Sequence, residues 1–228
     1  MRINKYLAHK GLTTRKGADA LVEKGAVFIN GKRASLGDKV LESDTVTLGK
    51  NTPKTSYAYF AYNKPKGIVT TNPQKGEQEI ISIADFGAKV FPVGRLDKDS
   101  TGLIIMTNDG RVTDRLLNPD KAHEKEYVVE TDKAVTESFV RKMSHGVNIG
   151  GYITKKCTVR KTGEKKFSII LTEGKNRQIR RMCAELGHRV NTLQRTRIMN
   201  ITLRGLKPGS SRKIIGNEQS TFLKSIGL

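Results

Sequence analysis

Hydrophobic and polar residues alternate along the N-terminal part of this chain with a helical period. The apolar spacing predicts a first helix with Ile3, Leu7 and Ala8 on one face and a second helix that carries Ala18, Leu21 and Val22. An apolar run and an Asn-Gly dipeptide follow, and Asn-Gly favours a β-hairpin because both central residues of a type I′ turn need positive φ. Residues 1–48 are therefore predicted to form a small module of two helices and a hairpin.

A short polar stretch separates this module from the rest of the chain. Residues 49–56 are small, hydrophilic and include a proline, a composition that is typical of linkers. The strand that follows carries apolar residues on both of its faces, which indicates burial inside a larger core. We therefore expect a module over 1–48, a linker over 49–56 and a second domain over 57–228.

The second domain mixes strands with irregularly spaced helices. Its apolar runs predict strands over 57–63, 66–71, 90–95, 103–107, 125–131, 155–160, 166–172 and 198–204, and helices over 79–86, 110–118, 135–144 and 176–187. Because the helices do not alternate regularly with the strands, we expect an α+β fold with a mixed, largely antiparallel sheet flanked by helices. The glycine-rich fingerprints of nucleotide binding are absent from the sequence.

The net charge of the chain predicts a polyanionic partner. The chain has 42 Lys and Arg against 22 Asp and Glu, a net charge of +20. Such a surplus favours nucleic acid, whose phosphates release counterions when a protein neutralises them. A membrane surface is the alternative, but the sequence has no apolar run of about 18 residues and no long basic amphipathic stretch rich in Phe or Trp.

Cysteine and histidine do not suggest a metal site. Cys157 and Cys183 lie far apart, and the 4 His have no close spacing to a cysteine, so we expect reduced thiols and no zinc. The first residues lack the apolar core of a secretory signal, and we expect a cytoplasmic protein. Repulsion among so many cations favours a monomer.

The N-terminal module concentrates basic residues on its helices. Arg2, Lys5, Arg15 and Lys16 lie on the first helix and at the entry to the second. The segment RINKYLAHKGLTTRKGADALVEKGAVFINGKRA resembles an S4 domain, a module that presents basic residues to structured RNA. The alternative is a solvated basic surface without a ligand.

One acidic pair stands out in the second domain. The segment GRLDKDSTGL, residues 94–103, places Asp97 and Asp99 in a tight loop between two apolar strands. A carboxylate at such a loop is either a structural cap or a catalytic group. The two acids point the same way if the segment is extended, so the spacing alone does not choose between them.

Arginines gather further along the chain. The stretch from 175 to 197 has one acid, Glu185, and these cations: Lys175, Arg177, Arg180, Arg181, Arg189, Arg195 and Arg197. On a helix, Arg177 and Arg180 project from adjacent turns, while Ile179 and Met182 line the opposite face. We interpret the arginine face as one that contacts RNA or pairs with an acid, because a merely solvated face would mix Glu with Lys.

Several segments together carry a family resemblance. NKPKG (63–67), GRLDKDSTGL (94–103), HEKEYVVE (123–130) and EGKNRQIRRMCAELG (173–187) resemble motifs of the pseudouridine synthases of the RsuA/RluA superfamily. The segment QRTRIMNITLRGL (194–206) is similar to the branch that modifies large-subunit ribosomal RNA.

The resemblance implies roles for individual residues. Asp97 matches the family's nucleophile or base, and Arg180 matches the basic partner that keeps this acid ionised. Tyr127 matches the active-site tyrosine, whose ring stacks on the target base and whose hydroxyl moves a proton. Arg95 would fill the gap left in the RNA by the extruded base. No cofactor or metal is implied, since the isomerisation gains and loses no group.

We therefore expect a site-specific pseudouridine synthase acting on 23S ribosomal RNA. The expected RNA-contacting residues are Arg95, Arg2, Lys5, Arg15, Lys16, Lys175, Asn176, Arg177, Arg181, Arg195 and Arg197. Two alternatives remain open. The enzyme would instead act on 16S ribosomal RNA or transfer RNA, or the chain would be a non-catalytic RNA-binding or ribosome-assembly protein of S4 type.

Overall fold

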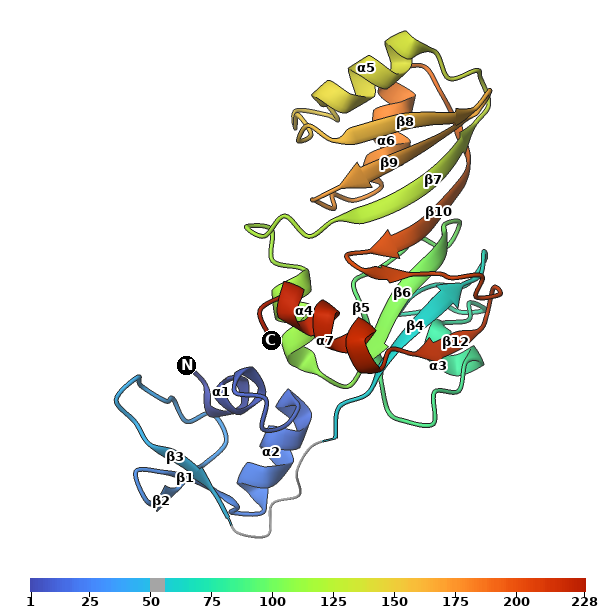
Figure 1. The fold of residues 1–228 in the computed structure, drawn as a ribbon. Coiled ribbons are helices and arrows are strands. Elements are labelled where there is room, and N and C mark those ends of the chain that lie inside the picture. The colour runs from blue at the N-terminus through green and yellow to red at the C-terminus, as the bar shows by residue number, and fades with distance from the viewer. Residues whose placement is uncertain (50–55) are drawn as a thin grey trace.

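A computed structural model describes residues 1–49 and 56–228 of the chain, and most of the expected linker over 49–56 lies outside the described residues. The first part contains α1 (Ile3–His9), α2 (Arg15–Glu23), β1 (Val27–Ile29), β2 (Lys32–Arg33) and β3 (Val46–Leu48). Its three strands form an antiparallel sheet in the order β2-β1-β3. The expected module of two helices and a hairpin is therefore present (Figure 1).

Local sequence signals account for this module. The Thr14 hydroxyl accepts a hydrogen bond from the Gly17 amide at 3.0 Å and so caps the start of α2. Asn30 and Gly31 have φ of 50° and 78°, as the hairpin turn between β1 and β2 requires. The faces predicted to be apolar meet in one core, formed by Ile3, Leu7, Ala18, Val22, Val27, Ala34 and Val40.

The second part is built on one large sheet. Its strands are β4 (Tyr59–Lys64), β5 (Phe91–Val93), β6 (Thr101–Thr107), β7 (Lys125–Thr131), β8 (Thr158–Gly163), β9 (Lys166–Leu171), β10 (Val190–Ile198), β11 (Ile201–Thr202) and β12 (Ser211–Lys213). Its helices are α3 (Ile80–Ile83), α4 (Gly110–Leu116), α5 (Glu137–His145), α6 (Gln178–Glu185) and α7 (Gly216–Ser225).

The sheet has two halves that meet at a narrow junction. The strand order is β12-β4-β6-β10-β7-β9-β8, with β5 added to β6 and β11 added to β10. The junction is the pairing of β6 with β10, which is parallel and joins Thr101 to Gln194 and Gly102 to Arg195. The other pairs among the described strands are antiparallel, so the sheet is mixed and largely antiparallel as expected.

The half that contains β4 and β6 is covered on both faces. Tyr59 and Ala61 pack with α4 and α7, while Phe60 and Tyr62 pack with α3 on the opposite face. The two apolar faces predicted for this strand are thus both buried. Figure 1 shows α4 and α7 in front of this half of the sheet.

The half that contains β7, β8 and β9 has its own core. Phe139 and Met143 of α5 and Ile179 and Met182 of α6 pack on the same face of the sheet, around the fully buried Phe167 of β9. Figure 1 shows α5 and α6 together beside these strands. Helix α6, which begins directly after Arg177 and contains Arg180, therefore buries the apolar stripe that its sequence predicts.

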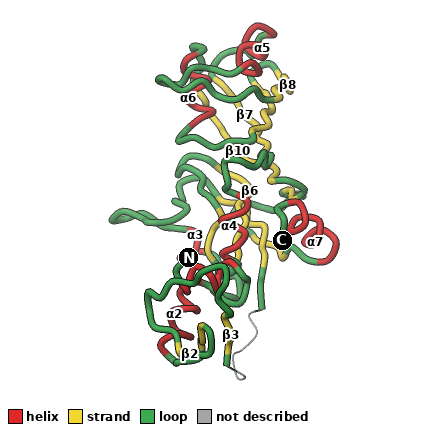
Figure 2. Tube along the Cα trace, turned by 90° about the vertical axis from the view of Figure 1, so that its left-hand side faces the viewer, coloured by secondary structure: helices red, strands yellow, loops and turns green. Residues whose placement is uncertain are grey.

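The N-terminal module lies against the second domain through α1 and α4 (Figure 2). The Tyr57 hydroxyl donates a hydrogen bond to the Gly11 carbonyl just after α1. The Arg111 guanidinium stacks on the Tyr57 ring, 4.6 Å from its centroid, and is held by Asp109 at 2.8 Å. Asp109 is fully buried and also accepts from the Tyr59 hydroxyl at 2.8 Å, so this contact rests on a rigid part of the core.

Two predicted strands differ from the structure. Residues 66–71 form a turn after β4 rather than a strand, because Gly67 has φ of 86° and Lys64 folds back onto the carbonyls of this segment. The strand predicted over 198–204 overlaps only the end of β10 and the short β11, and β12 and α7 near the C-terminus were not predicted. Irregularities after Val190 and Arg195 break the period-two pattern of β10.

Gly102 is expected to be essential for the junction between the two sheet halves. Its φ is 107°, and a Cβ at this position would lie 2.2 Å from the Arg195 carbonyl oxygen. We therefore expect Gly102→Ala to lower the free energy of unfolding by at least about 2 kcal/mol, measured by urea denaturation. Gly110→Ala is the matched control, because a Cβ there meets open space in a helix. Equal stability of the two variants would contradict this reading of the junction.

Candidate active site

Asp97 lies in the loop that connects β5 to β6, immediately before the junction. The Ser100 amide donates to the Asp97 carbonyl at 3.0 Å and closes a tight turn. The side chain of Leu96 packs against the cores of both sheet halves. Leu96 therefore fixes the position of Asp97, whose own side chain stays 32% exposed.

A buried threonine binds the backbone of Leu96. The Thr70 hydroxyl donates to the Leu96 carbonyl at 2.8 Å and accepts from the Leu96 amide at 3.0 Å. Thr70 is 3% exposed. The sequence analysis did not single it out, because a threonine in a short polar segment carries no signal of its own.

Lys64, from the NKPKG segment, places a buried cation below the loop. Its ammonium donates to the carbonyls of Pro65 at 2.9 Å, Ile68 at 2.6 Å and Lys98 at 3.3 Å. Burial lowers the pKa of Lys64 to about 8, although the nearby carboxylates of Asp97 and Asp99 act to raise it. The contact with the Lys98 carbonyl ties this cation directly to the residue after Asp97.

Arg177 is the cation that the structure places beside Asp97. Its Nη1 lies 3.8 Å from Asp97 Oδ2, and its side chain is 49% exposed. Arg177 precedes α6 with φ of 48° and ψ of 32°, a left-handed conformation that costs energy outside glycine. Such strain persists only where neighbouring contacts impose it.

The turn before α6 supplies those contacts through Glu173. Its carboxylate accepts from the Gln178 side-chain amide at 2.8 Å and from the Tyr152 hydroxyl at 2.6 Å. Gln178, which is buried, in turn accepts from the Lys175 amide at 3.0 Å. These bonds hold the turn on either side of Arg177, and none of them was anticipated from the sequence.

Arg180 occupies a different place from the one expected. The sequence pairs it with Asp97, but its Nη1 donates to the Val190 carbonyl at 3.2 Å and its Nη2 to the Asp99 carbonyl and the Ser100 hydroxyl, each at 3.4 Å. Arg180 thus braces the loop that carries Asp97, and Arg177, which the sequence analysis assigned to RNA contact, lies within ion-pair distance of the carboxylate.

Tyr127 lies two strands away from the loop, in register with the junction. Across the sheet, Gly102 of β6 pairs with Arg195 of β10, and Arg195 pairs with Tyr127 of β7. Tyr127 is 8% exposed, and Leu96 packs against the core that includes it. The strand register therefore places this tyrosine on the same part of the sheet as the Asp97 loop.

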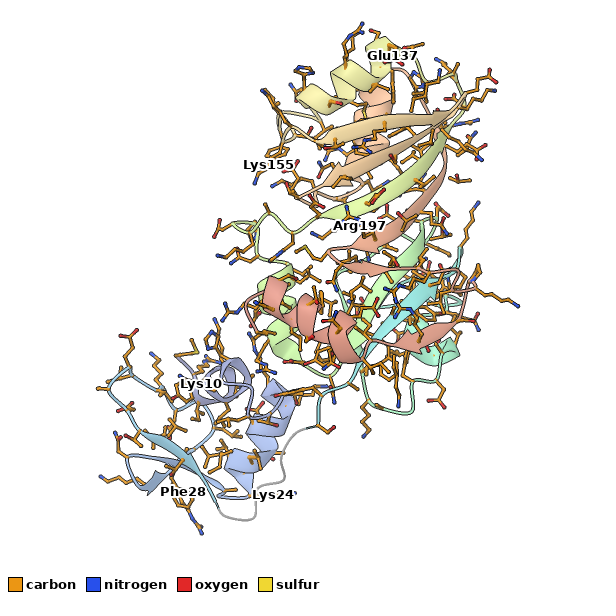
Figure 3. All side chains as sticks on the ribbon, in the orientation of Figure 1. Lys10, Lys24, Phe28, Glu137, Lys155 and Arg197 are labelled. Atoms are coloured by element: carbon orange, nitrogen blue, oxygen red, sulfur yellow. The ribbon has the colours of Figure 1, made fainter. Side chains whose placement is uncertain are left out.

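Two arginines expected to contact RNA are used inside the fold instead. Arg195 is 4% exposed, and its Nε donates to the Leu103 carbonyl at 2.7 Å. Arg197, whose position is labelled in Figure 3, donates to Glu126 at 2.8 Å and to Glu124 at 3.0 Å. The predicted RNA contact is wrong for Arg195 because it is buried, and Arg197 is committed to two carboxylates.

The remaining predicted RNA contacts lie at the surface. Exposed positions are Arg2, Lys5, Arg15, Lys16, Arg95, Lys175, Asn176, Arg177 and Arg181. Arg15 forms a loose pair with Asp114 at 3.8 Å, and Lys175 stacks over the Tyr152 ring. Arg181 donates to the Ile149 carbonyl. Most of these cations therefore keep donors available to a ligand.

The described residues contain no cluster of His, Cys, Asp or Glu that would hold a metal ion. In the same part of the chain, the helices are too short or too polar to cross a bilayer. The thiols are unpaired, and burial raises the pKa of Cys157 to about 11 and that of Cys183 to about 12.

Comparisons with known proteins agree with the resemblance seen in the sequence. A family model for RNA pseudouridylate synthase matches residues 58–185, and the S4 domain model matches residues 1–46. The dual-specificity RNA pseudouridine synthase RluF of Escherichia coli (strain K12) is 44% identical over 99% of this chain and 79% of its own length.

In two further matches, the aligned region covers nearly all of this chain and nearly all of the matched protein. The ribosomal large subunit pseudouridine synthase B of Bacillus subtilis (strain 168) is 31% identical over 95% of this chain and 93% of its own length. A crystal structure of a pseudouridylate synthase superposes with a TM-score of 0.72 at 28% identity, over 99% of each chain.

Lys64 should titrate well below an ordinary lysine. We expect its ammonium to lose its proton with a pKa of about 8, against about 10.4 for a fully solvated lysine side chain. Between these values the unfolded state binds more protons than the folded state, so this group makes the free energy of unfolding rise with pH. Lysine side-chain NMR would follow the Lys64 resonance, and a titration midpoint at about 10.4 would rule out a desolvated ammonium.

Proposed function

The chain belongs to the RNA pseudouridylate synthase family and is an RNA pseudouridine synthase with an N-terminal S4 domain, and we propose that its substrate is 23S ribosomal RNA and that Asp97 performs the chemistry. The observation that supports the role of Asp97 most directly is its position. It is a partly exposed carboxylate in a rigid loop, 3.8 Å from the Arg177 guanidinium.

The reaction needs a carboxylate of this kind. Pseudouridine forms when the C1′–N1 bond of uridine breaks, the base turns, and C1′ bonds to C5, while the C5 proton leaves and N1 gains a proton. The product is an isomer of the substrate, so no oxidant, reductant or group donor is consumed. Asp97 either attacks the ribose as a nucleophile or removes a proton from it as a base.

Two cations support the negative charge of Asp97. Arg177 lies on the exposed side of the carboxylate, and Lys64 lies beneath the loop in a buried site. A carboxylate that loses water when a nucleotide covers it would otherwise favour its neutral form. Arg180 acts on the same loop as a positioning residue, since its guanidinium holds Asp99 and Ser100.

Tyr127 is the proposed partner for the base. Tyr127 is 8% exposed and belongs to the core against which Leu96 packs, and its strand is in register with the junction. An aromatic ring in this position offers a stacking surface for an extruded uracil, and its hydroxyl offers a group that transfers a proton late in the reaction. Extrusion itself costs a few kcal/mol, which contacts between basic residues and phosphates offset.

The large-subunit target rests on one relative and on the segment over residues 194–206. The relative from Bacillus subtilis is named for the ribosomal large subunit. A second RNA substrate is the alternative, because the relative from Escherichia coli is named a dual-specificity enzyme. We propose transfer RNA or 16S ribosomal RNA as the candidates to compare with 23S ribosomal RNA.

A non-catalytic RNA-binding protein of S4 type would not need this site. Such a protein would gain nothing from a left-handed Arg177 held beside an accessible carboxylate. The test that separates the two is whether loss of the carboxylate removes a modification or only a binding contact.

Asp97→Asn should abolish pseudouridine formation and leave RNA affinity within about twofold, because the substitution removes a charge without removing volume. The assay incubates the full chain with unmodified 23S, 16S and transfer RNA separately and maps pseudouridine by carbodiimide primer extension. Asp99→Asn is the matched control, since Asp99 lies two residues away and contributes its backbone carbonyl to Arg180.

The outcome assigns each part of the proposal. Each pseudouridine appears as a stop in primer extension. Stops on 23S ribosomal RNA with the wild-type chain and with Asp99→Asn, but not with Asp97→Asn, support both 23S ribosomal RNA as the substrate and Asp97 as the residue that performs the chemistry. Stops that persist with Asp97→Asn would remove Asp97 from the chemistry. Stops confined to another RNA would replace the target and keep the enzyme.

A further inference from the structure

A hollow lies beside the proposed catalytic pair, between α6 and the start of β10. Its volume is about 500 Å³. The residues that line it are Asp132, Arg177, Arg180, Ala184, Gly187, His188, Arg189 and Val190. We call it the α6–β10 hollow.

The hollow carries an excess of positive charge. Arg177, Arg180 and Arg189 line it together with a single carboxylate, that of Asp132. The Asp132 side chain is already used, because it accepts from the backbone amide of Arg189 at 2.8 Å. Among residues 1–49 and 56–228, no carboxylate lies within ion-pair distance of the guanidinium of Arg180 or Arg189.

Part of this lining is rigid and lacks partners. The Nη atoms of Arg180 are fixed by Val190 and by the Asp97 loop, while its Nε is buried without a hydrogen bond. The Nδ1 atom of His188 is also buried without a hydrogen-bond partner. The centroid of the His188 ring lies 4.3 Å from the centroid of the Phe139 ring. Arg180 is thus held in place as a fixed positive charge, and the exposed guanidinium groups of Arg177 and Arg189 offer donors to an anion with several acceptor oxygens.

Arg177 connects the hollow to the proposed chemistry. It lines the hollow and also lies 3.8 Å from Asp97. An anion held here would therefore lie next to the nucleotide on which Asp97 acts. In RNA, the anionic group adjacent to a reacting nucleoside is the phosphodiester of its own strand.

We propose that the α6–β10 hollow binds a backbone phosphate of the RNA strand next to the target uridine. This inference rests on the proposed function and adds a site to it. Arg189 and Arg177 contact the phosphate oxygens, and Arg180 supplies a fixed charge behind them. The hollow thus sets the register in which the strand crosses the Asp97 loop.

Arg189 is the residue through which the site is tested. Its side chain is exposed, and its backbone stays bonded to Asp132 through both the amide and the carbonyl, so removal of the side chain preserves the fold. Arg160 on β8 is the matched control, because it is an exposed arginine on the outermost strand of the same sheet half.

The experiment measures the affinity of the full chain for an unmodified 23S ribosomal RNA transcript by filter binding at several KCl concentrations. All proteins carry Asp97→Asn, so that the RNA is not modified during the measurement. We expect Arg189→Ala to weaken binding about tenfold and to reduce the slope of log K against log salt by about 0.8, the loss of one phosphate contact. Arg160→Ala should keep the slope of the parent, and Arg189→Lys should restore it.

The proposal is overturned if Arg189→Ala keeps the parent slope, or if Arg160→Ala lowers it equally, since either result would mean that only net charge matters. Failure of the proposed function appears separately, as the absence of pseudouridine in the mapping assay with the wild-type chain. A slope that depends on Arg189 without any modification would support the site and reject the reaction.

Discussion

The close parallel approach of β6 to β10 is the constraint on which the site depends. Two residue pairs join the sheet halves, and one of them brings the Gly102 backbone so near Arg195 that no side chain fits there. Because the Asp97 loop leads directly into this pairing, its position is set by both halves at once. Leu96 extends the same coupling into the cores on either side.

Cations surround the loop in three different ways. Lys64 donates to the Lys98 carbonyl of the loop, Arg180 braces its outer turn, and Arg177 faces its carboxylate. The Arg177 side chain is half exposed, so its guanidinium remains accessible to a ligand. Two of the three cations bind the backbone or hydroxyl groups of the loop and not the Asp97 carboxylate. This arrangement explains how a chain with a net charge of +20 keeps one acid accessible. The charge attracts RNA at long range, while a few buried contacts fix the geometry that chemistry requires.

The sequence predicted those features that depend on local patterns. The N-terminal hairpin, both apolar faces of β4 and the buried stripe of α6 follow from spacing and turn chemistry. The sequence missed most of β10 because irregularities break its alternation. It also paired Arg180 with Asp97, whereas Arg177 lies nearer to that carboxylate, because the left-handed backbone at Arg177 sets a side-chain direction that helical spacing does not predict. Thr70 and Glu173 act through tertiary contacts that leave no pattern in the chain.

The central claim is that Asp97, beside Arg177, meets the ribose of an extruded uridine. A crystal structure of the full Asp97→Asn chain with an unmodified RNA substrate tests it most directly. The account predicts a uridine turned out of its stack, with its C1′ within about 3.5 Å of the residue 97 side chain and with Arg177 in contact with that side chain. A uridine that stays stacked in the RNA, or one whose ribose lies against a different acid, would contradict the account.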